Sequence, residues 1–87
     1  MGKEIDMFEW VLRNSLDPNF LFTVKDVRKG VDTSRATVYR FFDFCVNNNL
    51  LIVVKRVNHK GIFRLSPEIN NYTSLQVFQM LQRYYAK

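Results

Sequence analysis

The stretch from residue 23 to residue 65 constrains the fold of this chain more than any other part. Its apolar residues recur at helical spacing before and after Gly30, and then gather in two short runs rich in β-branched residues. The stretch holds nine Lys or Arg and three Asp, whereas the rest of the chain holds four cationic and five acidic residues. The charge of +5 therefore comes from one contiguous region. This pattern predicts two short helices and a β-hairpin that share a basic surface.

Length and composition favour one folded domain. The chain has 87 residues, enough for a single core, and 47% of them are hydrophobic, which argues against disorder. Cys45 is the single cysteine and falls at an apolar helical position, so we expect a buried free thiol in a reducing compartment. No segment has the pattern of a signal peptide or the length of a bilayer-spanning helix. We therefore expect a cytoplasmic protein with no membrane partner.

The segment before residue 23 predicts one helix and a short extended piece. Helical spacing of apolar residues favours a helix over residues 3–16. Its expected buried stripe consists of Ile5, Phe8, Val11, Leu12 and Leu16. Trp10 lies off this stripe and is expected to pack against another element. Residues 17–19 are typical of a turn, and residues 20–22 suit a small strand or a core-filling loop.

The next residues predict a pair of helices. Thr23 and Asp26 have the spacing of a capping box, which marks the start of a helix. Gly30 is expected to end this helix in the left-handed conformation. A second helix of the pair is expected to reach about Asn48, capped by one of Asp32, Thr33 and Ser34. Its expected inward face consists of Val38, Phe41, Phe42 and Cys45.

The remaining residues predict a hairpin and a last helix. We expect strands over 51–57 and 62–65, joined by a four-residue loop built around a type I turn. Before them, we expect Asn49 to adopt the left-handed backbone conformation. Ser66 and Pro67 suit the start of the last helix, whose long part is expected from about Tyr72.

The predicted organisation is one α+β domain over residues 1–87. It comprises a helix-turn-helix over 23–48, a β-wing over 51–65 and a C-terminal dimerisation helix over 66–87.

One motif also resembles a known family. Residues 33–42, Thr-Ser-Arg-Ala-Thr-Val-Tyr-Arg-Phe-Phe, followed by residues 49–51, Asn-Leu-Leu, resemble the recognition helix and its exit in winged helix-turn-helix transcription regulators. Phe42 stands where that family commonly has Leu, and Asn49 stands where it has Gly; both are compatible with the fold. The resemblance covers about residues 23–65. It implies a three-helix core, a two- to three-stranded β-wing, an extra C-terminal helix and sequence-specific binding of double-stranded DNA. The implied DNA contacts come from Ser34, Arg35, Thr37, Tyr39 and Arg40.

In a helix-turn-helix, the second helix enters the major groove with its outward residues toward the bases. Arg40 lies opposite the inward face, and we expect it to read a base, because its planar guanidinium can bind guanine through two hydrogen bonds. The alternative is a surface ion pair with Asp43.

The predicted wing adds cationic residues that would approach the phosphate backbone or the minor groove. They are Lys55, Arg56, His59, Lys60 and Arg64. Lys60 near the tip is the strongest candidate, and strand alternation places Lys55 and Arg56 on opposite faces. Part of this charge could instead protect a strand edge from aggregation. The preceding helix adds three more cations, which face either the DNA backbone or only solvent. They are Lys25, Arg28 and Lys29.

The last helix carries an apolar arc wider than one side of a small domain needs. We expect a second copy to contact Leu75, Phe78, Leu81 and Tyr85. The resulting two-fold dimer would read half-sites about one turn of DNA apart. The alternative is that this arc covers only the core of its own chain.

The residue pattern does not favour catalysis. No paired carboxylates, Cys/His pair, phosphate-binding loop or metal-ligand cluster is evident, so we expect no enzyme, cofactor, metal or small-molecule ligand. The leading hypothesis is a homodimeric DNA-binding transcription regulator. A winged-helix module for protein–protein interaction is the alternative. RNA binding stays open, although the hairpin offers only Phe63 for base stacking.

Overall fold

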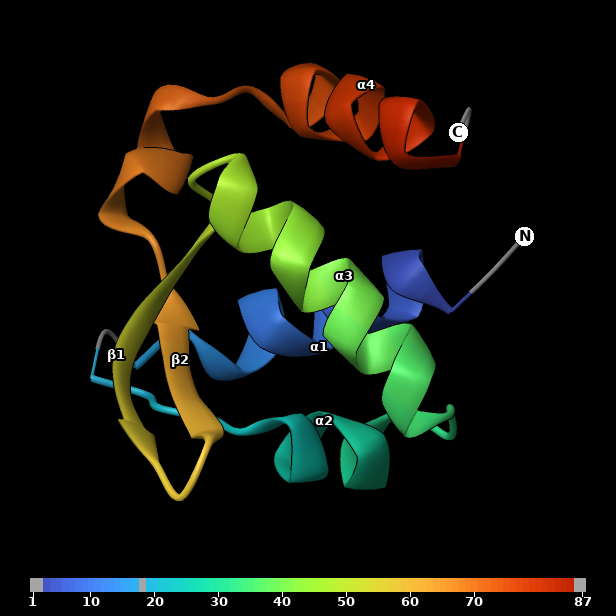
Figure 1. Cartoon of the computed structure of the whole chain (residues 1–87). Helices are drawn as coiled ribbons and strands as arrows, with labels where there is room; N and C mark the ends of the chain where they lie inside the picture. Colours follow the sequence, from blue (N-terminus) through green and yellow to red (C-terminus); the bar gives the residue numbers. More distant parts are fainter. Residues whose placement is uncertain (1–2, 18, 86–87) are drawn as a thin grey trace.

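The computed structural model describes residues 3–17 and 19–85, except for the side chains of Ser74, Phe78 and Tyr85. This part of the chain has an α+β fold with four α-helices and one antiparallel two-stranded sheet (Figure 1). The helices are α1 (Glu4–Asn14), α2 (Val24–Gly30), α3 (Arg35–Asn47) and α4 (Ser74–Tyr85). The strands are β1 (Leu51–Val57) and β2 (Lys60–Leu65), and a 3₁₀ helix, Pro67–Asn71, precedes α4.

Helix α1 buries part of the stripe that its spacing predicts, with Met7 in place of the stripe's last residues. Met7, Phe8 and Val11 are buried, whereas Leu12 is 40% and Leu16 is 86% exposed. Met7 takes the core position because it lies one turn before Val11 on the side that meets α2 and α3. Leu16 lies beyond the last residue of the helix. The prediction that Leu12 and Leu16 join the buried stripe is therefore wrong.

Trp10 lies between elements, as expected, and explains the glycine at the end of α2. Its ring packs edge-on against Phe20 and Phe22, with centroids 5.8 and 6.0 Å away. The indole also lies against Gly30, where an added Cβ would overlap it. Gly30 is not left-handed: it is the last residue of α2, and the helix ends at Val31 with an extended φ of −130°. The absence of a side chain at Gly30 makes room for the indole.

Local capping residues fix the two helices that follow. Thr23 and Asp26 form the expected capping box, in which each side chain accepts a hydrogen bond from the other residue's backbone N–H. Ser34 is the N-cap of α3. The inward face of α3 is as predicted, and Phe42 packs against Phe63 of β2 with ring centroids 4.7 Å apart. This contact fixes the hairpin against α3.

The hairpin has a tighter turn than the sequence predicts. Val57 pairs with Lys60, so only Asn58 and His59 form the connection. Both have positive φ, 51° and 67°, as in the mirror-image type I′ turn, which matches the right-handed twist of paired strands. The predicted four-residue loop is therefore wrong. The register also shifts beside Val54, which bends β1.

Residues 20–22 contribute a single bridge to this sheet. Phe22 pairs with Phe63 through two backbone hydrogen bonds of 3.0 and 2.8 Å. The bridge lies on the side of β2 away from β1, so the sheet is three strands wide at this point. β1 is consequently an edge strand.

The C-terminal part is split, as the sequence allows, but α4 begins later than Tyr72. Ser66 caps the 3₁₀ helix, and Thr73 and Gln76 exchange hydrogen bonds of 2.8 and 3.2 Å at the start of α4. Tyr84 then packs its ring against Phe41 and Phe44 of α3.

Helix α4 uses part of its apolar arc on its own core. Leu81 is 5% exposed and packs in the core of its own chain, which differs from the expected contact with a second copy. Leu75 is 64% exposed. The side chains of Phe78 and Tyr85 lie outside the described residues. Within residues 3–17 and 19–85, no helix combines the length and apolar character needed to cross a membrane.

Candidate nucleic-acid interface

The start of α3 is fixed by two of the hydroxyls that were predicted to contact DNA. The Ser34 Oγ accepts a hydrogen bond from the Thr37 backbone N–H at 3.2 Å, and the two side-chain oxygens are 2.8 Å apart. Ser34 is exposed and Thr37 is half-buried. These hydroxyls therefore stabilise the helix start first, and any contact with a ligand is additional to that role.

The outward face of α3 carries Arg40. The buried residues of α3 lie on one side, so helical geometry places a polar strip on the other, and its members are exposed. They are Ala36, Arg40, Asp43 and Asn47. This strip offers a guanidinium, a carboxylate and an amide, the groups that read base edges in a major groove.

Arg40 lies on the flank of this strip that is nearer to α4. Burial raises the pKa of Tyr84 above its usual value, the negative charge of Glu4 adds to the rise, and the positive charge of Arg40 opposes it. Tyr84 belongs to α4 and packs on α3. The hairpin lies on the other flank, where Phe42 meets Phe63.

On the hairpin side, three elements enclose a cationic depression of about 380 Å³, which we call the basic hollow. Its walls come from the start of α2, the start of α3 and the first residues of β2. Its lining residues are Thr23, Val24, Lys25, Arg28, Arg35, Tyr39, Lys60 and Gly61. Four of these are Lys or Arg, and none of these lining residues is acidic. The arrangement concentrates positive potential where a phosphate group can approach from solvent.

Tyr39 orients one of these cations. The Arg35 Nη2 donates a hydrogen bond of 3.4 Å to the Tyr39 hydroxyl, and the guanidinium carbon lies 5.3 Å from the ring centroid. Both contacts reduce the freedom of the Arg35 side chain, because they connect positions one helical turn apart. Tyr39 is half-buried, so its main contribution to the basic hollow is to hold Arg35 in place.

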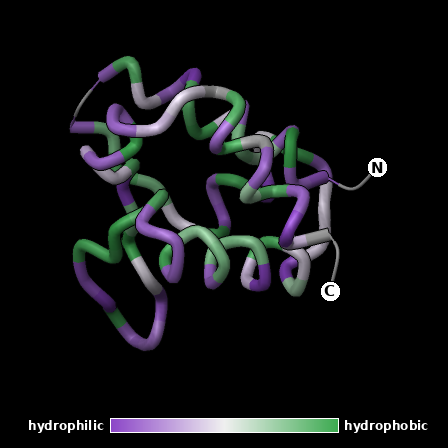
Figure 2. Tube along the Cα trace, turned by 90° about the horizontal axis from the view of Figure 1, so that it is seen from above, coloured by the Kyte–Doolittle hydropathy of each residue, from purple (hydrophilic) through white to green (hydrophobic). Residues whose placement is uncertain are grey.

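The strand register decides which cations of the hairpin lie beside the basic hollow. Arg56 pairs with Gly61, and its Nη1 lies 3.6 Å from the position of a Cβ at Gly61. Arg56 therefore extends the rim of the basic hollow. Lys55 pairs with Ile62 and faces the opposite side of the sheet, as strand alternation predicts. Figure 2 shows that the hairpin tip is hydrophilic.

Other predicted residues lie outside the basic hollow. His59 is exposed in the turn and Lys29 is exposed near the end of α2. Arg64 is half-buried and lines two other depressions, one over the outer face of the sheet and one beside the 3₁₀ helix. The structure thus separates Arg64 from the cations with which the sequence grouped it.

The sequence did contain one overlooked signal for the hollow. Gly61 lies inside β2, and glycine within a strand often marks a close approach of other groups. A Cβ there would come within 2.8 Å of the Phe63 ring. Gly61 therefore lets the ring lie beneath the floor of the basic hollow, while Lys60 stands at its edge.

The described residues contain no group of three or more His, Cys, Asp and Glu side chains that could hold a metal ion. Cys45 is buried, and burial raises the pKa of its thiol, which disfavours the reactive thiolate.

Comparisons of the chain with protein families, with curated proteins and with solved structures found no match.

Proposed function

We propose that this chain is a winged helix-turn-helix protein that binds double-stranded DNA and regulates transcription. The basic hollow is the observation that carries this proposal. Four cationic side chains from α2, α3 and β2 converge there without an acidic residue in its lining. A phosphate backbone is the ligand that such a surface attracts most strongly.

In the proposed complex, α3 enters the major groove with its outward strip toward the bases. Arg40 reads a base, and the basic hollow with Arg56 on its rim binds the backbone of the adjacent strand. The arrangement of elements supports this docking, because residues of α2, the first half of α3 and the first residues of β2 meet around the basic hollow. Asp43, exposed on the same strip, would disfavour contact with phosphate and favour a cytosine amino group.

We further propose that the chain acts as a homodimer through α4. Leu75 is a large apolar side chain that is 64% exposed on this helix. A two-fold dimer would present two α3 helices to one palindromic site.

The hairpin provides a matched pair of variants that tests the DNA proposal. Lys60 lines the basic hollow, whereas Lys55 carries the same charge on the neighbouring strand and is not among its lining residues. A duplex selected from a random-sequence pool serves as the ligand. We expect Lys60→Ala to weaken binding to all duplexes and to reduce the slope of log K against log salt by about 1. Lys55→Ala should change the slope less.

Arg40→Ala tests base reading separately. It should cost about 1–3 kcal/mol on the selected duplex and relax sequence preference at one position. If selection yields no preferred duplex, and if both Lys variants behave like the parent, the DNA proposal fails. A protein–protein interaction module would then be the better assignment.

A further inference from the structure

The outer face of the sheet is unusually apolar for a surface that meets solvent. An antiparallel sheet with one face on the core normally turns polar side chains outward. Here Leu21, Ile52 and Val54 point outward and are 48%, 39% and 44% exposed. They come from the segment before α2 and from β1, so they span the width of the sheet. Ile62, from β2 between them, is half-buried.

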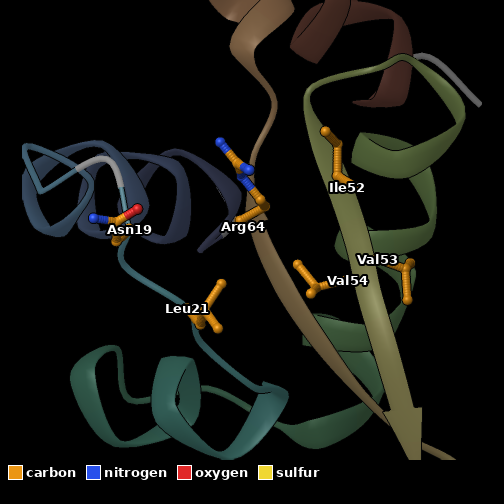
Figure 3. A pocket seen from close by; sticks show the side chains of 6 residues that line it. All are labelled: Asn19, Leu21, Ile52, Val53, Val54 and Arg64. Carbon is orange, nitrogen blue, oxygen red and sulfur yellow. The ribbon is translucent and has the colours of Figure 1, made fainter.

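Arg64 lies in the middle of this face. It pairs with Ile52 across the sheet, so the two side chains share the outer side. Figure 3 shows Leu21, Arg64 and Val54 around one depression, with Val53 turned to the other side of β1. The depression measures about 480 Å³, and Asn19 completes its lining. We call it the outer-face hollow.

The Arg64 guanidinium has an unmet hydrogen-bonding capacity. Its Nε is buried and has no hydrogen-bond partner among the described residues. A buried donor without an acceptor costs free energy, and a carboxylate is the acceptor that a guanidinium binds best. None of the residues that line the outer-face hollow is acidic. Asp17 lines the neighbouring depression beside the 3₁₀ helix, which Arg64 also lines, so it is on the outer-face side that a carboxylate for the Arg64 guanidinium has to come from another molecule.

We propose that the outer-face hollow is the docking site for an amphipathic helix of a partner protein, with an apolar stripe and a carboxylate that binds Arg64. A helix suits the site better than an added strand, because the bulge beside Val54 interrupts the regular hydrogen-bonding edge of β1. The size agrees as well. Three strands are about 10 Å across, close to the diameter of one helix with its side chains.

Charge distinguishes this occupant from the other candidates. A second copy would bring the same cationic face, with Arg64 and Lys55, against itself, and like charges at an interface are unfavourable. A nucleic acid would gain little from an apolar floor with one guanidinium. The outer-face hollow and the basic hollow share no lining residue, so partner and duplex can bind at the same time.

A phage-displayed library of helical peptides, randomised over one face, tests this proposal with the parent chain as bait. We expect selected peptides to combine apolar residues at helical spacing with Asp or Glu. Val54→Lys and Arg64→Glu should each weaken the best peptide by at least about tenfold. Leu12→Lys is the matched control, because Leu12 is 40% exposed on α1, lines neither hollow and receives the same kind of change, so it should leave affinity unchanged.

A charge swap makes the test specific for Arg64. A peptide whose selected acid is replaced by Arg should bind the Arg64→Glu variant better than the parent, and circular dichroism shows whether each variant is folded. Peptides without acid enrichment, or peptides insensitive to both substitutions, would overturn the proposal. So would a parent dimer that Val54→Lys converts to a monomer in sedimentation, because the occupant would then be a second copy.

Discussion

Gly30 shows how one methyl group can reverse the usual effect of a substitution. In an exposed helix position, Gly→Ala normally stabilises a protein by up to about 1 kcal/mol. At Gly30, the added Cβ would overlap the Trp10 indole. We therefore expect Gly30→Ala to lower the free energy of unfolding by about 1–3 kcal/mol, the usual cost of overpacking. Urea unfolding followed by circular dichroism measures this change.

The control repeats the substitution without the indole. In a Trp10→Leu background, Gly30→Ala should cost less than half as much as in the parent, because the smaller side chain leaves space for the methyl group. An equal cost in both backgrounds would contradict the steric explanation.

Cys45 links stability to alkaline pH. Burial raises the pKa of its thiol in the folded chain, whereas the unfolded thiol ionises near its ordinary pKa of about 8.5. The unfolded state therefore loses the proton first, so stability is complete below about pH 8.5 and falls as pH rises above it. The expected slope approaches about 1.4 kcal/mol per pH unit. Urea unfolding between about pH 7 and 9.5 measures it, and Cys45→Ala should be less stable but should lack this slope.

At the scale of elements, the hairpin turn separates a conformational role of His59 from a role in binding. Its φ of 67° is unfavourable for any residue with a Cβ. We expect His59→Gly to stabilise the chain by about 1 kcal/mol and His59→Val to destabilise it by about 1–2 kcal/mol. Thermal unfolding measures both. Equal stabilities would show that the turn is not left-handed, and unchanged duplex affinity of the Gly variant would remove His59 from the interface.

The elements that the sequence predicted correctly are those fixed by their own neighbours. The capping box at Thr23 depends on a partner three residues away, and the left-handed Asn49, with a φ of 60°, depends on its own side chain. The roles of Gly30 and of the residues in the turn were predicted wrongly, because a distant indole and the twist of two strands decide them. The pattern of neighbouring residues in the sequence shows neither the position of the indole nor the twist of the strands.

The candidate site follows the same distinction. Charge counting identified its cations, because their clustering is visible along the chain. It could not separate Lys60, which lines the basic hollow, from Arg64, which lines the outer-face hollow. That separation depends on the register and twist of the hairpin. The contact between Arg35 and Tyr39 is local, but its place beside Lys60 is tertiary.

For the whole molecule, the positions of α2 and α4 decide whether a dimer can still bind DNA. The two helices lie at opposite sides of α3 (Figure 1). The basic hollow involves the start of α2, whereas the proposed dimer contact uses α4. A second copy on the exposed side of α4 would therefore leave both basic hollows uncovered.

Leu75 allows this dimer to be tested without unfolding the chain. It is 64% exposed, so Leu75→Glu should leave the free energy of unfolding within about 0.5 kcal/mol in a monomer. If α4 forms a two-fold interface, the same substitution should convert dimers to monomers in sedimentation and weaken binding to a palindromic duplex. Leu81→Glu should behave differently: Leu81 is 5% exposed, so the charge would be buried and the chain itself would unfold. A parent that is monomeric at micromolar concentration would contradict the dimer, and duplex recognition would then require only one α3 helix.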